Sequence, residues 1–97
     1  MIINHTSDSN KGLFFVQEGA DILARLDYAI PEPGKMIIEH TEVNDVLRGQ
    51  NVGYLLVKSA VEYARLQHLK ILPHCPFAAA LFKKKPELAD VLLSSTL

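Results

Sequence analysis

The segment 48–53 carries a basic side chain, glycines and amides directly before a run with helical apolar spacing: Arg48, Gly49, Gln50, Asn51, Val52 and Gly53. The first N–H groups of a helix lack partners within the helix and lie at the positive end of its dipole. Glycines let such N–H groups converge on an anion, and a guanidinium suits phosphate. The segment therefore predicts either a phosphate-binding loop or an ordinary helix start with Asn51 as its N-cap.

Two other side chains belong to types that move protons or act as nucleophiles. Histidine titrates near neutral pH, so His40 could serve as a general base, with Glu39 and Glu42 as lesser candidates acting through water. Cys75 directly precedes Pro76, a residue typical of the first turn of a helix, and a thiol at a helix N-terminus has a depressed pKa. The plainer interpretations are a histidine without a role and a small buried cysteine.

No metal site is expected from the sequence. His74 and Cys75 are adjacent, and adjacent residues rarely converge on one ion. No His-x-x-x-His or Cys-x-x-Cys spacing accompanies them. The consecutive lysines at 83–85 form the only basic cluster, and they are most simply a solvated helix end favoured by the helix dipole.

The composition fits one small globular domain over residues 1–97, with 48% hydrophobic and 22% charged residues. A net charge of −1 without a basic stripe argues against binding to nucleic acid or anionic lipid. The single cysteine suits a reducing compartment, and the N-terminal residues do not resemble a signal peptide. No apolar run approaches the ~20 residues of a membrane span. We therefore expect a cytoplasmic domain that binds neither nucleic acid nor membrane.

The first half of the chain predicts three antiparallel strands. A polar N-terminal segment, residues 1–12, is interpreted as a tail or turn. Apolar and polar residues alternate most clearly in the second strand, as is typical of a half-buried strand. Between the second and third strands, Pro33-Gly34 suits a type II turn. The expected strands are 13–18, 20–30 and 36–43.

In the second half of the chain, the apolar spacing changes to that of a helix. This helix forces the next strand to run parallel to the third strand by a right-handed crossover. The predicted fold class is α/β, with a mixed sheet and the order β-β-β-α-β-α-α. The expected elements are a helix at 51–67, a strand at 69–72, helices at 76–85 and 86–93, and a frayed tail at 94–97.

This topology predicts where a ligand would bind. In a β-α-β unit, ligands lie at the carboxyl ends of the parallel strands, beside the helix N-terminus. That corner is bounded here by residues 41–43, 48–53 and 73–75. His40 lies near the same end of its strand, and strict alternation would place it on one face with Met36, Ile38 and Glu42.

The spacing Arg48-x-x-Asn51-x-Gly53 resembles the Q/R-x-x-G-x-G/A signature of the GCN5-related N-acetyltransferase family. Asn51 stands in place of the first motif glycine, and asparagine is the least costly substitute where φ must be positive. From Phe14 to Leu92 the chain is similar to a minimal, YjdJ-type subgroup of single-domain proteins. The segments that carry this likeness are HTEV, LRGQNVGYLLV and ILPHCPFAAALFKK.

The resemblance implies direct transfer of an acetyl group from acetyl-CoA to an amine. Residues 48–53 would hold the pyrophosphate of coenzyme A. The pantetheine arm would lie along Thr41, Glu42 and Val43, in a gap between strands 36–43 and 69–72. A backbone N–H near Val43 would polarise the thioester.

The resemblance also gives His40 and Cys75 roles in the transfer. His40 would be the base, and Cys75 would act as acid, orient the acceptor or carry the acyl group, since no tyrosine follows Tyr63 to serve as acid. A lysine of 83–85 could reach the ribose phosphate. The acceptor would be a protein lysine or another amine. A non-catalytic coenzyme A-binding or sensing module and a structural, protein-interaction domain remain as alternatives.

Overall fold

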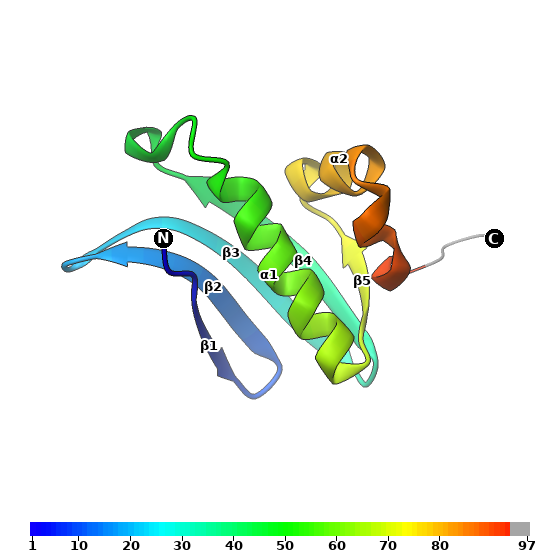
Figure 1. Cartoon of the computed structure of the whole chain (residues 1–97). Coiled ribbons are helices and arrows are strands. Elements are labelled where there is room, and N and C mark those ends of the chain that lie inside the picture. The colour runs from blue at the N-terminus through cyan, green and yellow to red at the C-terminus, as the bar shows by residue number, and fades with distance from the viewer. Residues whose placement is uncertain (94–97) are drawn as a thin grey trace.

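The computed structural model describes residues 1–93, which form a five-stranded mixed sheet with helices packed on it (Figure 1). The strands lie side by side in chain order, and the first four are antiparallel. The fifth runs parallel to the fourth, as the sequence predicts. The expected frayed tail, 94–97, lies outside the described residues. The strands are β1 (Asn4–Asp8), β2 (Lys11–Glu18), β3 (Asp21–Glu32), β4 (Lys35–Val43) and β5 (Lys70–Pro73).

β1 corrects the prediction of a tail or turn within residues 1–12. It pairs antiparallel with β2, so the meander has four strands instead of three. The segment shows no apolar alternation, and its anchor is instead a single side chain. The His5 ring stacks on Phe14, with ring centroids 4.1 Å apart, and its Nε2 lies 2.7 Å from the Tyr28 hydroxyl. Main-chain pairing and this one ring hold a strand that is otherwise polar.

The hairpin between β3 and β4 follows the predicted turn. Glu32 pairs with Lys35 across the two-residue loop, and Gly34 has a φ of 83°, which a type II turn requires at that position. The alternation predicted for β3 is confirmed from Ala24 to Tyr28, where inward side chains such as Leu26 are buried, but Ile22, which alternation places on the same face, is 43% exposed. On the opposite face, Arg25 and Asp27 form an ion pair at 2.9 Å.

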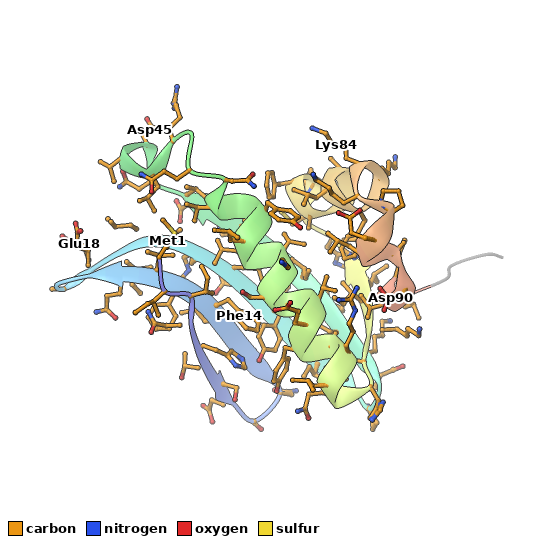
Figure 2. All side chains as sticks on the ribbon, in the orientation of Figure 1. Met1, Phe14, Glu18, Asp45, Lys84 and Asp90 are labelled. Atoms are coloured by element: carbon orange, nitrogen blue, oxygen red, sulfur yellow. The ribbon has the colours of Figure 1, made fainter. Side chains whose placement is uncertain are left out.

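The helix α1 (Val52–Gln67) crosses one face of the sheet (Figure 1) and buries its apolar side against it. Phe14 of β2 is buried on the side of the sheet that α1 covers (Figure 2). The helix ends at His68, which has a left-handed φ of 58°. Its backbone N–H donates to the carbonyl oxygens of Ala64 and Arg65. No helix in the described part of the chain is long and apolar enough to span a membrane. The buried residues of α1 are Val52, Leu56, Val57, Ala60, Val61 and Ala64.

After β5 the chain forms α2 (Pro76–Lys84) and a short 3-10 helix, η2 (Pro86–Val91). The predicted third helix thus begins at Pro86 as expected, but with tighter winding. Asp90 of η2 joins it to α1 and β5: its carboxylate accepts two bonds from Arg65, at 2.7 and 3.0 Å, and its carbonyl accepts one from Lys70. Such a bidentate pair fixes where η2 lies against the rest of the fold.

Candidate active site at the carboxyl end of β4

β4 contains a β-bulge before its carboxyl end. His40 lies opposite Asp27, but the next pair along the ladder is Ile38 with Tyr28. Glu39 is therefore an extra residue with no counterpart on β3. A bulge of this kind reverses the alternation of side chains beyond it.

The reversal changes the face on which His40 lies. Ile38 is fully buried before the bulge, whereas beyond it Thr41 is half-buried and both His40 and Glu42 are exposed. The prediction that His40 shares a face with Met36 and Ile38 is therefore wrong. It does share a face with Glu42, and the His40 Nε2 lies 3.9 Å from a Glu42 carboxylate oxygen. The His40 side chain is 61% exposed and faces away from α1.

Beyond the bulge, β4 and β5 separate. Within the described residues, their pairing ends at Ile38 and Pro73. The Ile38 carbonyl accepts the N–H groups of both His74 and Cys75, at 3.0 and 3.1 Å, where the chain turns from β5 into α2. Beyond this point the two strand ends are no longer paired in the described residues, and α1 and α2 lie on either side of them (Figure 1).

The loop from β4 to α1 begins with a single 3-10 turn, η1 (Asp45–Leu47). Asn44 caps this turn, since its Oδ1 accepts the N–H of Val46 at 2.9 Å. Arg48 follows the turn and forms an exposed ion pair with Asp45 at 2.9 Å. Arg48 is therefore directed back to its own loop.

The backbone at Asn51 tests the interpretation of the loop as an ordinary helix start. Its φ of 62° and ψ of 29° are left-handed, and its side chain makes no capping hydrogen bond. The interpretation of Asn51 as a conventional side-chain N-cap is therefore wrong. Gly49 also has a positive φ, of 84°. The backbone thus curls twice before α1, and the first N–H groups of the helix keep no partner from the Asn51 side chain.

The start of α1 faces α2 across a cleft of about 370 Å³. Gly53 is essential to its shape, because a Cβ at that position would lie 2.5 Å from the Phe77 ring. On the same side, the Lys85 ammonium lies over the Tyr54 ring, 5.2 Å from its centroid. The cleft is lined by Asn51, Gly53, Tyr54, Phe77, Leu81, Lys84 and Lys85.

Cys75 and Thr41 meet in the gap between β4 and β5. The Cys75 thiol is 6% exposed, and its Sγ lies 3.4 Å from the Thr41 hydroxyl oxygen. Burial raises the pKa of the Cys75 thiol, but hydrogen bonds from the Thr41 hydroxyl and from backbone N–H groups in the first turn of α2 outweigh it. The net result is a pKa below that of an ordinary cysteine. The thiol is therefore held beside a hydroxyl that can stabilise its thiolate.

The structure disperses the other predicted site residues. Gln50 lines an open hollow of about 800 Å³ on the far side of the loop from the cleft, together with Leu47. Glu42 and Val43 line a small pocket of about 190 Å³ at the ends of β3 and β4. Val52 is buried in the core.

Three cleft residues were not among the predicted site residues: Tyr54, Phe77 and Leu81. Their apolar spacing along the two helices is indistinguishable from that of core positions. Only the position of α2 beside the start of α1 in the structure shows that Tyr54 and Phe77 border a cleft. The basic cluster at 83–85 was the one sequence signal for the second wall, since two of its lysines line the cleft.

A family model described as GCN5-related N-acetyl-transferase matches residues 13–91, which include the whole bulge, loop and cleft. The chain belongs to the GCN5-related N-acetyltransferase family. No curated protein matches the chain at a significant level. The family assignment confirms the resemblance to the GCN5-related N-acetyltransferases, whereas the likeness to the YjdJ-type subgroup stays a prediction.

Solved structures show the same acetyltransferase fold. The NMR structure of a GCN5-like protein from Staphylococcus aureus is 34% identical, with a TM-score of 0.75, over 96% of this chain and 90% of that one. A ribosomal-protein-alanine N-acetyltransferase from Brucella melitensis is 13% identical, with a TM-score of 0.65, over 93% and 67%. A family member from Elizabethkingia anophelis with acetyl-CoA bound is 14% identical, with a TM-score of 0.61, over 79% and 53%. The chain thus spans about half the length of this last acetyltransferase.

Proposed function

We propose that the chain is an acetyl-CoA-dependent N-acetyltransferase that transfers the acetyl group directly to an amine. The observation that carries this proposal is the left-handed, uncapped start of α1 at Asn51, which opens onto the cleft beside the separated ends of β4 and β5. Membership of the family supports it. So do two proteins of the same fold solved with acetyl-CoA bound, from Elizabethkingia anophelis and Bacillus anthracis.

The pyrophosphate of the coenzyme would lie at the N–H groups from Asn51 to Tyr54. These groups lie at the positive end of the α1 dipole, and the positive φ values of Gly49 and Asn51 turn the backbone toward one point. Arg48 is paired with Asp45 in this structure, so it would add charge at the rim only after leaving that ion pair. The pantetheine arm would enter the gap between β4 and β5, next to Thr41.

The chemical step needs a neutral amine and a stabilised leaving thiolate. A lysine-like amine is almost wholly protonated at pH 7, a handicap of about 4 kcal/mol that a base must offset. The bulge places His40 and Glu42 on the open face of β4, where an amine can approach from solvent. His40 would take the proton of the amine, directly or through water.

Cys75 lies on the other side of the same strand end, where the coenzyme sulfur would arrive. Its lowered pKa makes the thiol a better proton donor than an ordinary cysteine. The thiol would protonate the departing coenzyme thiolate, and the Thr41 hydroxyl would stabilise the Cys75 thiolate that remains. The two candidate groups thus serve opposite faces of β4, one for the acceptor and one for the leaving group.

The binding part of the proposal is tested by calorimetry with acetyl-CoA. Saturable binding is expected, together with a rise in the melting temperature when the coenzyme is added. Absence of binding at millimolar acetyl-CoA would contradict the proposal. Release of free coenzyme A in the presence of lysine peptides or small amines then tests transfer and narrows the acceptor class.

A non-catalytic coenzyme A-binding module is the second candidate. It is favoured by the exposure of His40, for which the described structure shows one ion-pair contact, to Glu42 at 3.9 Å. This candidate predicts that His40→Ala and Cys75→Ala leave any acetyl transfer unchanged while the coenzyme still binds. The enzymatic proposal predicts that either change lowers kcat and leaves coenzyme binding largely intact.

A further inference from the structure

We propose that Lys84 and Lys85 form a second anion-binding centre in the cleft, which binds the 3′-phosphate of coenzyme A and selects it over 3′-dephospho-coenzyme A. The inference rests on the proposed function, because it assigns a specificity to the same cleft. Both lysines line the cleft together with Asn51 and Gly53 at the start of α1. The positive end of the α1 dipole and the two lysine ammonium groups at the end of α2 therefore border the same cleft.

The lysines are available for a ligand. Arg25, Arg48 and Arg65 each pair with a carboxylate in the described structure. Neither Lys84 nor Lys85 has such a pair among the residues that the structure describes. An exposed ammonium without a carboxylate partner needs no bond broken before it can meet a phosphate.

Lys85 is also positioned by a contact within the cleft. Its ammonium lies 5.2 Å from the centroid of the Tyr54 ring, and Tyr54 belongs to the first turn of α1. Cation–π attraction of this kind holds the charge toward α1 instead of leaving it free in solvent. Lys84 projects from the same end of the molecule at which α1 begins (Figure 2).

The chemistry of coenzyme A matches two separated centres. Its pyrophosphate is on the 5′ side of the ribose and its phosphate monoester is on the 3′ side. A helix start can hold one of these groups, and it leaves the other, with a charge of about −1.5 to −2 at pH 7, to be neutralised. The ammonium groups of Lys84 and Lys85, which line the same cleft as the helix start, supply that neutralisation as point charges.

Lys83 is a matched control within the same helix turn. It lies in the last turn of α2 and interacts favourably with the helix dipole, as Lys84 does. It lines a different, largely apolar hollow with Leu72 and Phe82. A role of the lysines that is only general charge or helix stability would therefore extend to Lys83, whereas a role in the cleft would not.

The test measures the dissociation constants of coenzyme A and 3′-dephospho-coenzyme A for the unmodified protein, for Lys84→Gln/Lys85→Gln and for Lys83→Gln. The unmodified protein and Lys83→Gln are expected to prefer coenzyme A by about tenfold, from two partly exposed ion pairs. The double variant is expected to lose this preference while its affinity for the dephospho form stays unchanged. Raised salt should reduce the preference.

Three results would overturn the inference. The unmodified protein could bind both forms equally well, the double variant could lose affinity for both forms alike, or Lys83→Gln could behave like the double variant. All three leave the proposed function standing, since the coenzyme still binds. Failure of the unmodified protein to bind either form would instead overturn both the proposed function and the inference.

Discussion

Around β1 four rings pack against one another, whereas at the start of α1 a cleft of about 370 Å³ separates two helices. In the first region, His5 lies between Phe14 and Tyr63 and meets the Tyr28 hydroxyl, and even Gly12 is required because the Tyr28 ring lies against its backbone. In the second region, a bulge, two left-handed residues and an uncapped helix start lie within 15 residues of chain, 39–53.

The difference separates the groups that hold the fold from the groups that serve a ligand. In the β1 region, rings fill the space and the His5 ring meets the Tyr28 hydroxyl. In the α1–α2 corner, the backbone adopts conformations that cost free energy and leaves donors directed at a cleft. Mutations should therefore affect stability in the first region and coenzyme binding in the second.

The largest effect is expected for Gly12→Ala. An added Cβ would lie 2.1 Å from the Tyr28 ring, which is itself fully packed, so the ring or the strand must move. We expect a loss of about 3 kcal/mol of unfolding free energy, measured by urea denaturation. Coenzyme affinity of the folded protein should not change. The matched control is Gly19→Ala, which has no atom within 4 Å of its Cβ and should lose only about 1 kcal/mol from its positive φ.

Gly53→Ala makes the corresponding change in the cleft. Its Cβ would meet the Phe77 ring at 2.5 Å, but this ring is 43% exposed and can swing away. We expect a small loss of stability and a fall in acetyl-CoA affinity of about tenfold, because the displaced ring enters the cleft. The double change Gly53→Ala/Phe77→Ala should recover most of the affinity. Equal affinities for Gly53→Ala and the unmodified protein would show that the cleft does not hold the coenzyme.

The sequence predicts the two regions unequally. Alternation in β3 and the helical spacing of α1 mark the core correctly, since both patterns follow from one-sided burial. The sequence does not predict β1, because the strand is anchored by the contact between the His5 ring and the Tyr28 hydroxyl, and these residues are 23 positions apart in the chain. The bulge at Glu39 is not predicted either, because no residue in the strand marks an extra position, and strict alternation therefore assigns His40 to the wrong face. The cleft depends on α2 meeting α1, which no local pattern encodes.

Thr41→Val is expected to change the chemistry of Cys75 without unfolding the protein. Removal of the hydroxyl takes away the side-chain hydrogen bond that lowers the pKa of the thiol, so that pKa should rise. The pH profile of alkylation by iodoacetamide should therefore shift to higher pH, with slower reaction at pH 7. His40→Ala serves as control, since His40 lies on the other face of β4. An equal shift in both variants would contradict the assignment of Thr41 as the partner of Cys75.

The smallest effect is expected from the pH dependence of stability in the β1 region. Partial burial lowers the pKa of His5 below that of an ordinary histidine. Below pH ~6.5 the unfolded chain therefore binds a proton more readily than the folded protein does, and stability falls as the pH falls. Because His5 as a whole residue is exposed, solvent screening should keep this loss under about 1 kcal/mol between pH 7.5 and 5. In His5→Gln this component should disappear in urea titrations at the two pH values, while acetyl-CoA affinity stays the same.

The proposed coenzyme site depends most on the backbone at Asn51. The most direct test therefore compares acetyl-CoA affinity in Asn51→Gly and Asn51→Val. If the left-handed backbone forms the site, glycine should bind the coenzyme as tightly as asparagine or up to about threefold more tightly, since it adopts positive φ without cost. Valine, which strongly disfavours positive φ, should weaken binding by about tenfold or more. A large loss of affinity in Asn51→Gly would contradict the account, because it would mean that the asparagine side chain, and not the curl of the backbone, holds the coenzyme.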